Sequence, residues 1–210
     1  MSGLIGKKIG MTNLFDQNGI RKACTVIEAG PCTITQIKDL KTDGYKAIQL
    51  SYDNLKKKKV NSAQSGHFKK SNSVPKKRLI EFKNFRNHQI NSFKLGMELK
   101  LEDVFNENDF LDVKSVSKGK GFQGVVKRHN FSGVGESTHG QHNRLRAPGS
   151  IGAGSTPSRV FKGMKMGGRM GGNNVKLLNL KVLKIKKQEN LIYVSGSVPG
   201  SNNSYVILEK

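Results

Sequence analysis

Residues 118–176 contain too much glycine and too few apolar side chains to fold by themselves. This basic extension carries fourteen glycines, eleven Lys or Arg residues and a single acid, Glu136. Its large apolar side chains follow no period of 2 or 3.6, so burial cannot offset the conformational entropy lost when the backbone is ordered. A polyanion would supply that order, because Lys and Arg meet phosphates and glycine lets backbone N–H groups approach closely. We therefore expect an irregular segment that is ordered by a nucleic acid.

The positive charge of the chain is concentrated in two places. The whole chain of 210 residues has a formal net charge of +22. Residues 118–176 contribute +10, and residues 54–80, with nine bases and no acid, contribute +9, which leaves +3 for the other 124 residues. Solubility alone does not require such a one-signed bias. A nearly neutral remainder with two basic segments is the electrostatic pattern of a nucleic-acid binder.

The candidate RNA contacts are the basic and histidine side chains of these two segments. Lys and Arg are expected to meet phosphates, and the histidines to hydrogen-bond to RNA or stack on it. Three methionines among them, at 164, 166 and 170, lack the period of a core helix and are expected to fill gaps against a folded partner. The predicted contacts are Lys56, Lys57, Lys58, Lys59, Lys118, Lys120, Lys127, Arg128, His129, His139, His142, Arg144, Arg146, Arg159, Lys162, Lys165 and Arg169.

Outside the basic extension, alternating apolar residues and turn signals predict a mainly β fold. Four short strands joined by tight turns within the first 52 residues favour an antiparallel barrel or sandwich. Asn61-Ser62 is expected to start a short helix that ends at Lys70, followed by a polar loop at Ser71–Arg78. Strands are expected at Leu4–Phe15, Ile20–Glu28, Cys32–Ile37, Tyr45–Tyr52, Leu79–Phe85, Gly96–Leu101, Phe110–Val116, Leu178–Val182, Leu191–Ser195 and Tyr205–Leu208.

Shifts in composition divide the chain into five segments. We expect a β-barrel assembled from residues 1–53, 96–117 and 177–210. An inserted small α+β subdomain, rich in basic residues, should interrupt it at 54–95, and the irregular RNA-binding extension at 118–176. Because this extension leaves one strand and returns to another, its two ends should lie close together.

Two local motifs suggest other functions, and neither has the context it needs. Gly119–Gly124 matches GxGxxG, but a dinucleotide site needs a βαβ unit with a long helix and an acid about 20 residues further on. His139 and His142 have only Glu136 nearby in the sequence, and this single acid is insufficient to complete a metal site. No GxSxG, P-loop or HExxH motif occurs, and no paired carboxylates occur in a plausible cleft setting. We expect no catalysis, cofactor, metal or small-molecule substrate, with RNA modification as a weak alternative.

The two cysteines and the lengths of the apolar stretches indicate in which cellular compartment the protein is found. Cys24 and Cys32 are eight apart without a CxxC or a neighbouring His, and are interpreted as small buried hydrophobes. Charged residues within the first 30 positions exclude a signal peptide. No window approaches the roughly 20 apolar residues of a membrane span. We expect a cytosolic protein that does not enter a membrane.

Several widely spaced motifs occur in a fixed order along almost the whole chain. They are Gly3–Thr12, the set Phe105, Asp112, Ser115, Ser117, Gly119-Lys120-Gly121, Gly124 and Arg128, and the stretches Ser137–Gly140, Arg146–Gly152 and Thr156-Pro157. Together they resemble the bacterial family of large-subunit ribosomal protein number three. A set of separate motifs in the right order is far more specific than any one of them.

The resemblance implies a fold and a place of action. The implied fold is a six-stranded, translation-factor-like antiparallel β-barrel with an insertion. The implied partners are large-subunit (23S) rRNA near its 3′ end and neighbouring large-subunit ribosomal proteins. The long loop would extend toward the peptidyl transferase centre, and the protein would help to start subunit assembly. Some family members carry a methylated glutamine where this chain has Ser155, so that modification is not expected here.

A nucleic-acid-binding architectural protein outside the ribosome remains the alternative. No helix-turn-helix, recognition helix or repeated arm is visible in the sequence. An irregular peptide suits the irregular cavities of a folded RNA better than it suits duplex DNA. Binding to structured ribosomal RNA and to duplex DNA of equal length would distinguish the two functions.

Overall fold

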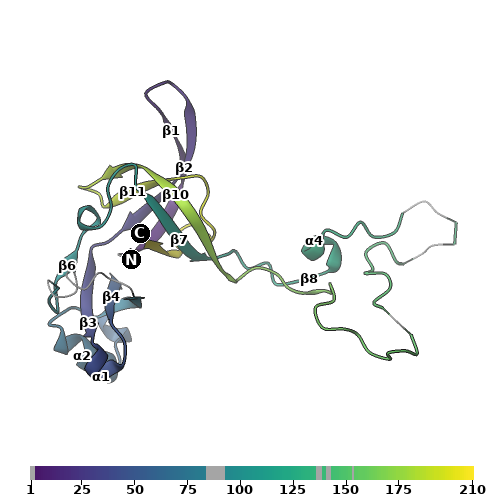
Figure 1. The fold of residues 1–210 in the computed structure, drawn as a ribbon, viewed down its shortest axis with the longest axis horizontal. Coiled ribbons are helices and arrows are strands. Elements are labelled where there is room, and N and C mark those ends of the chain that lie inside the picture. Colours follow the sequence, from purple (N-terminus) through teal and green to yellow (C-terminus); the bar gives the residue numbers. More distant parts are fainter. Residues whose placement is uncertain (1–2, 84–92, 136–138, 141–142, 153) are drawn as a thin grey trace. The chain divides into compact units, whose positions relative to one another are not determined.

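Six antiparallel strands form a closed ring in the computed structural model (Figure 1). The structure describes residues 3–83, 93–135, 139–140, 143–152 and 154–210, without the side chain of Lys57. The order around the ring is β1-β12-β7-β10-β11-β2, which confirms a mainly β fold. These strands are β1 (Gly3–Phe15), β2 (Arg21–Ala29), β7 (Phe110–Val116), β10 (Asn174–Lys186), β11 (Leu191–Ser195) and β12 (Tyr205–Glu209).

The first and last strands close the ring. β1 pairs with β2 across the turn that begins at Asp16, where the Gly19 N–H donates to the Asp16 carbonyl at 2.9 Å. The other edge of β1 pairs with β12, with Gly3 opposite Glu209. The N and C markers accordingly lie together in Figure 1. Every ring strand has two partners, so the ring has no open edge.

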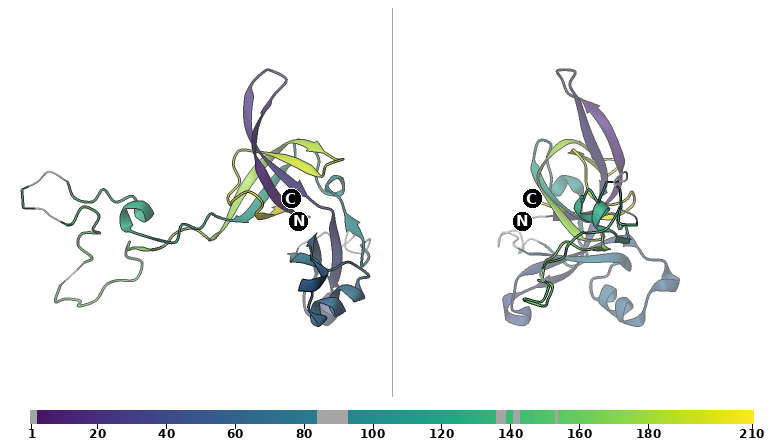
Figure 2. Two further views of the ribbon diagram at one scale, coloured as in Figure 1. Left: turned by 180° about the vertical axis from the view of Figure 1, so that it is seen from behind. Right: turned by 90° about the vertical axis from the view of Figure 1, so that its right-hand side faces the viewer.

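A second antiparallel sheet takes strands that we expected in the barrel. It contains β3 (Cys32–Lys38), β4 (Ala47–Asn54), β5 (Lys76–Lys83) and β6 (Glu98–Leu99), in the order β5-β4-β3-β6. The assignment of residues 32–53 and 96–101 to the barrel was therefore wrong. The ring ladder stops at Gly30, which has a φ of +74°, and at Pro31, which has no N–H to donate. Figure 2 shows both sheets from two further sides.

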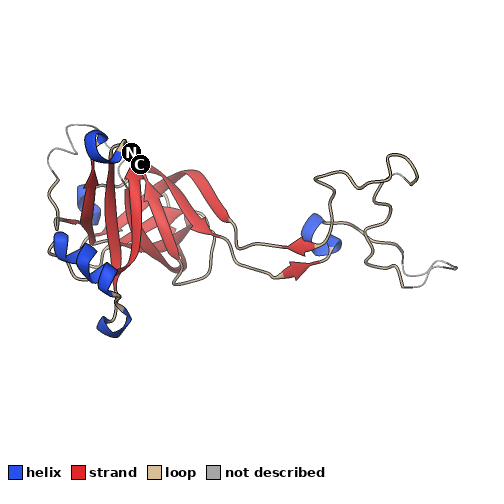
Figure 3. Cartoon of the chain, turned by 90° about the horizontal axis from the view of Figure 1, so that it is seen from below, coloured by secondary structure: helices blue, strands red, loops and turns tan. Residues whose placement is uncertain are grey.

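Short helices and turns connect the strands of the second sheet, as Figure 3 shows in blue. The predicted helix is confirmed as α2 (Ser62–Lys70), and the Asn61 N–H donates to the Gln64 side chain at 3.3 Å. β5 begins inside the predicted loop, and the predicted strand end at Phe85 lies outside the described residues. The remaining helical elements are α1 (Leu40–Asp43), η1 (Lys57–Lys59), η2 (Leu101–Asp103) and α4 (Val125–His129). Among the described residues, no helix is long and apolar enough to cross a membrane.

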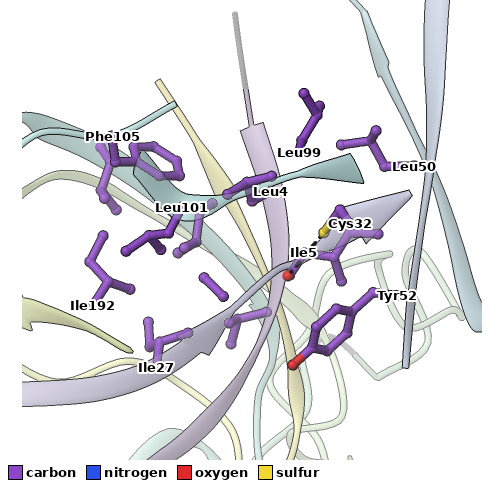
Figure 4. Close-up of a cluster of buried hydrophobic side chains, with 14 of the residues drawn as sticks. Leu4, Ile5, Ile27, Cys32, Leu50, Tyr52, Leu99, Leu101, Phe105 and Ile192 are labelled. Atoms are coloured by element: carbon purple, nitrogen blue, oxygen red, sulfur yellow. Dashed lines mark hydrogen bonds between the residues drawn. The ribbon is translucent and has the colours of Figure 1, made fainter. Parts of the chain in front are cut away.

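One hydrophobic core joins the ring to the second sheet (Figure 4). Leu4, Ile5 and Ile27 of the ring belong to the same buried cluster as Leu50 of the second sheet. Cys32 lies where the two meet, and its thiol donates to the Ile5 carbonyl at 3.5 Å. Burial raises the pKa of this thiol to about 11. Both cysteines are buried and free, as the sequence predicts.

The shared core gives a test of stability within one strand. Ile5 is fully buried, whereas Ile9 of the same strand is 43% exposed. We predict that Ile5→Ala lowers the free energy of unfolding by about 2–5 kcal/mol, because it removes core contacts and leaves a cavity. The control Ile9→Ala should cost less than about 1 kcal/mol. Urea unfolding followed by circular dichroism measures both, and equal losses would contradict the shared core.

Candidate nucleic-acid interface

The candidate interface is the loop unit, residues 117–173, which is one of the two compact units of the chain. The other is the body unit, residues 1–116 and 174–210. Val116, at the end of β7, pairs with Asn174, at the start of β10. This pairing holds the two ends of the loop unit side by side and confirms that they lie close together. Figure 3 draws most of the unit as loop, in tan.

The base of the loop unit is a two-stranded stem. The Lys120 N–H donates to the Met170 carbonyl, and the Met170 N–H donates to the Gly121 carbonyl, each at 2.9 Å. Further along, β8 (Phe122–Gln123) pairs with β9 (Gly168–Arg169). The expectation of wholly irregular structure was therefore wrong at this base. Backbone pairing needs no apolar periodicity, which is the signal the sequence lacks.

Two glycines lie where the backbone of the loop unit crosses itself. Gly171 has a φ of +71°, and a Cβ there would lie 2.0 Å from the carbonyl oxygen of Lys118. Gly133 has a φ of +75°, and its Cβ would lie 2.0 Å from the carbonyl oxygen of Leu145. Both the dihedral angle and the close approach exclude a side chain. These glycines therefore allow backbone segments to pack directly on one another.

Two predicted RNA contacts, Arg128 and His129, bind the loop unit to itself. The Arg128 Nη1 donates to the Met166 carbonyl at 2.8 Å, and the His129 Nε2 lies 3.0 Å from the same oxygen. A Cβ on Gly168 would lie 2.5 Å from the Arg128 Nη1, so glycine makes room for the guanidinium. Both side chains are half-buried. The short helix α4 is thereby held against the chain that leads into β9.

Most of the other predicted basic contacts are exposed and unpaired. No ion pair between described residues involves any of them. The only acid of the loop unit, Glu136, lies outside the described residues. Exposed cations without a carboxylate partner are available to phosphates. In the loop unit they are Lys118, Lys120, Lys127, Arg144, Arg146, Arg159, Lys162, Lys165 and Arg169.

Aromatic and apolar side chains are exposed among these cations. The Phe122 side chain is 79% exposed, and Phe161 and Met164 are also open to solvent. The Arg159 guanidinium lies 5.4 Å from the centroid of the Phe161 ring. Aromatic faces and guanidinium planes are the groups on which unstacked bases stack. The loop unit therefore offers surfaces for bases as well as for phosphates.

The predicted run Lys56–Lys59 belongs to the body unit. Lys56, Lys58 and Lys59 are exposed, and the side chain of Lys57 lies outside the described residues. The run forms one 3-10 turn, closed by a bond of 2.8 Å from the Lys59 N–H to the Lys56 carbonyl. It presents several cations within a few residues.

The alternative motifs are in contexts unlike those of a cofactor or metal site. The GxGxxG stretch is followed by α4, a helix of only five residues, and β8 pairs antiparallel with β9. A dinucleotide site instead requires a parallel βαβ unit with a long helix. His139 is exposed, whereas His142 lies outside the described residues. Within the described part of the chain, no three His, Cys, Asp or Glu residues gather as metal ligands.

The prediction overlooked a cation cluster around Tyr205 in the body unit. The Arg78 guanidinium lies 4.8 Å from the Tyr205 ring centroid, and the Nζ atoms of Lys77 and Lys7 lie at 5.5 and 5.6 Å. The sequence signal was the run Lys76–Arg78, which we counted in the basic segment but expected in a loop. The structure places this run on β5.

Comparisons with known proteins give one consistent match. A family model described as "Ribosomal protein L3" matches residues 20–191. The chain is 53% identical to "Large ribosomal subunit protein uL3" of Salinibacter ruber (strain DSM 13855 / M31) over 209 residues, which cover 100% of this chain and 99% of that protein. It is 49% identical to the protein of the same name from Chlorobium phaeobacteroides (strain BS1) over 206 residues, or 98% of this chain and 97% of the relative.

The crossing at Gly171 predicts that adding a Cβ disrupts the stem at Gly171 but not at Gly119. Gly171→Ala should open the stem, because its Cβ would lie on the Lys118 carbonyl oxygen. Amide hydrogen exchange at Lys120 and Met170 should then speed up by about tenfold or more, as expected when two backbone hydrogen bonds of about 1 kcal/mol each are weakened. In Gly119→Ala, where no atom lies within 4 Å of the added Cβ, exchange should be unchanged. Equal exchange in the two variants would rule out a tight crossing.

Proposed function

This chain belongs to the ribosomal protein L3 family, and on that basis we propose that it is a cytoplasmic component of the large ribosomal subunit that binds its ribosomal RNA. One structural observation carries the RNA-binding role. The loop unit exposes nine predicted cations that form no ion pair between described residues. As a member of a family of ribosomal proteins, the chain is a structural protein rather than an enzyme.

The finer part of the proposal concerns fold and location. We propose that the ring is a translation-factor-like barrel, into which the second sheet is inserted between β2 and β7. The protein would bind 23S rRNA near its 3′ end, contact neighbouring large-subunit proteins and help to start subunit assembly. Residues 118–176 would be the main RNA-binding segment and extend toward the peptidyl transferase centre. The order of the family motifs along the chain supports this proposal.

The proposed RNA contacts fall into four groups. The nine exposed Lys and Arg residues of the loop unit contact phosphates. Arg128 and His129 position the backbone of the loop unit and offer RNA only the donors that Met166 does not use. His139 and His142 hydrogen-bond to RNA or stack on it, and Lys56–Lys59 form a separate contact from the body unit.

Preference for structured RNA separates this function from an architectural role outside the ribosome. We predict that the protein binds large-subunit rRNA more tightly than duplex DNA of equal length in filter binding at moderate salt, because an irregular loop fits folded RNA. Equal affinity for the two, with no preference among RNAs, would favour the architectural alternative.

The salt dependence of binding tests the phosphate contacts. We predict that replacing Lys118, Lys120 and Lys127 by Ala makes the log-log slope of affinity against salt shallower by up to about three, one unit per lost phosphate contact. The matched control replaces Lys41, Lys94 and Lys100, which are exposed lysines of the body unit. Slopes that agree between the two triple variants would show that the loop-unit lysines do not touch phosphate.

We expect the middle of the loop unit to affect peptide-bond formation more than RNA binding or subunit assembly. Arg144–Pro157 lies near the middle of the unit along the chain, and it holds no group poised as a general base or nucleophile. We predict that deleting Ile151–Ser155 leaves RNA binding and subunit assembly intact. The deletion should instead alter peptide-bond formation or sensitivity to antibiotics that act at the peptidyl transferase centre.

Sucrose gradients and peptide-bond formation by purified ribosomes measure these two outcomes. A control in which five serines replace Ile151–Ser155 separates loop length from side-chain identity. Loss of assembly in the deletion variant would show that this stretch attaches the protein. Unchanged peptide-bond formation and unchanged antibiotic response would show that it has no effect at the centre.

A further inference from the structure

A pocket in the body unit is lined by a group of apolar side chains, the floor, and by two cations, the rim. Its volume is about 410 Å³, and strands β5, β7 and β12 contribute to its walls. Leu79, Val116 and Ile207 supply the apolar surface, and Arg78 and Lys114 supply the charge. This volume falls within the roughly 300–1,000 Å³ of small-ligand sites. None of these five side chains is among the RNA contacts predicted from the sequence.

The surroundings of the pocket favour an anion. Tyr205 lines the pocket, and the three cations around its ring have two described carboxylates near them: Asp53, and Glu28, which lies opposite Lys7 on β2. Asp53 accepts a hydrogen bond from the Tyr205 hydroxyl and pairs with the Lys7 ammonium at 2.9 Å and with the Lys77 ammonium at 3.9 Å. The hydrogen bond to Asp53 raises the pKa of Lys7, so this cation remains charged. Two carboxylates against three cations still leave an excess of positive charge, which an anionic ligand would balance.

The apolar floor is open to solvent. The Leu79 side chain is 38% exposed and the Val116 side chain 48% exposed, although they lie beside one pocket. Within the described residues, β5 pairs only with β4, so its second edge also has no strand partner. A ligand that combines a flat apolar surface with a negative charge would cover the floor and reach the rim at once. A nucleotide has this combination in its base and its phosphate.

We propose that this pocket binds one unstacked nucleotide of single-stranded RNA, with the base against Leu79 and Val116 and the phosphate against Arg78 and Lys114. The inference rests on the proposed function, since it takes rRNA as the partner. It adds a base-binding contact in the body unit, separate from the loop unit and from Lys56–Lys59. An acidic peptide would offer the same combination only where an aromatic side chain lies beside its carboxylate.

The rim is tested by the double variant Arg78→Ala with Lys114→Ala. Both side chains are exposed, so the fold should persist, and circular dichroism checks this. We expect rRNA affinity in filter binding to fall about tenfold and the salt slope to become shallower by up to about two. The matched control, Lys41→Ala with Lys100→Ala, removes the same charge from exposed positions elsewhere on the body unit and should lower affinity less than about twofold.

The proposed contact between the base and the floor is tested by cross-linking, which shows which residues lie next to the RNA. Large-subunit rRNA carrying photoreactive thiouridine should cross-link to peptides that contain Leu79 or Val116. The double variant Leu79→Ser with Val116→Ser should lose these cross-links and keep those of the loop unit. Both positions are partly exposed, and a thermal melt close to that of the unchanged protein confirms that the variant is folded.

Three results would overturn the pocket proposal. The rim variant could bind RNA like its control, or the cross-links could fall only in the loop unit and Lys56–Lys59. Alternatively, the pocket variants could keep full RNA affinity while reconstituted subunits lose a neighbouring protein, which would identify a peptide as the occupant. Failure of the proposed function has a different signature, because the unchanged protein would then show no preference for rRNA over duplex DNA. In that case a short single-stranded oligoribonucleotide, bound to the same variants, still decides whether the pocket takes a nucleotide.

Discussion

The antiparallel pairing of β7 with β10 is the constraint on which the organisation of both units depends. β7 pairs with β12 on one side and β10 on the other, so the core of the ring fixes its position. Its last residue, Val116, is paired with Asn174, and between them the chain makes the whole loop unit. The entropy cost of bringing those two ends together is met by the packing of the ring. The loop unit therefore needs no hydrophobic core to be held at its base.

Within the loop unit, the backbone provides the contacts that side chains provide elsewhere. The stem is held by peptide groups, and the crossings at Gly133 and Gly171 bring peptide groups against one another. The Arg128 side chain also stabilises the loop unit, and the group that accepts its hydrogen bond is again a peptide carbonyl. The exposed cations repel one another, and the single acid of the loop unit, Glu136, cannot offset them, which favours an open surface until an anion is bound. A backbone-based scaffold thus leaves most basic side chains uncommitted.

The sequence predicted elements better than their assembly. Phe110–Val116 and Leu191–Ser195 were placed to the residue, because alternation and turn residues mark them on both sides. β3 was found as a strand but placed in the wrong sheet, since a period of two shows that residues are buried without showing against what. β8 and β9 are too short to carry any period, and their pairing joins Phe122 to the distant Arg169.

The candidate site shows the same division. Charge counting located the exposed cations of the loop unit, because this unit contains a single acid, Glu136, and so offers its Lys and Arg residues almost no carboxylate partners. Charge counting did not distinguish Arg128 from the other cations. Arg128 donates to the backbone carbonyl of Met166, and every residue type has such a carbonyl, so the sequence does not mark this contact. Charge counting also missed the group around Tyr205, because Lys7 and Arg78 come from different sheets and meet only in the folded body unit.

Closure of the ring by β12 has a consequence for the order of events during synthesis. β12 ends at Glu209 and pairs with β1, which starts at Gly3, so the ring closes only after almost the whole chain has been made. Contacts between such distant residues form late, and until then β1 keeps an unpaired edge. The loop unit is translated earlier than β12, and its stem pairs residues much closer together in sequence. The nascent chain thus exposes the basic residues of the loop unit while the ring is still open.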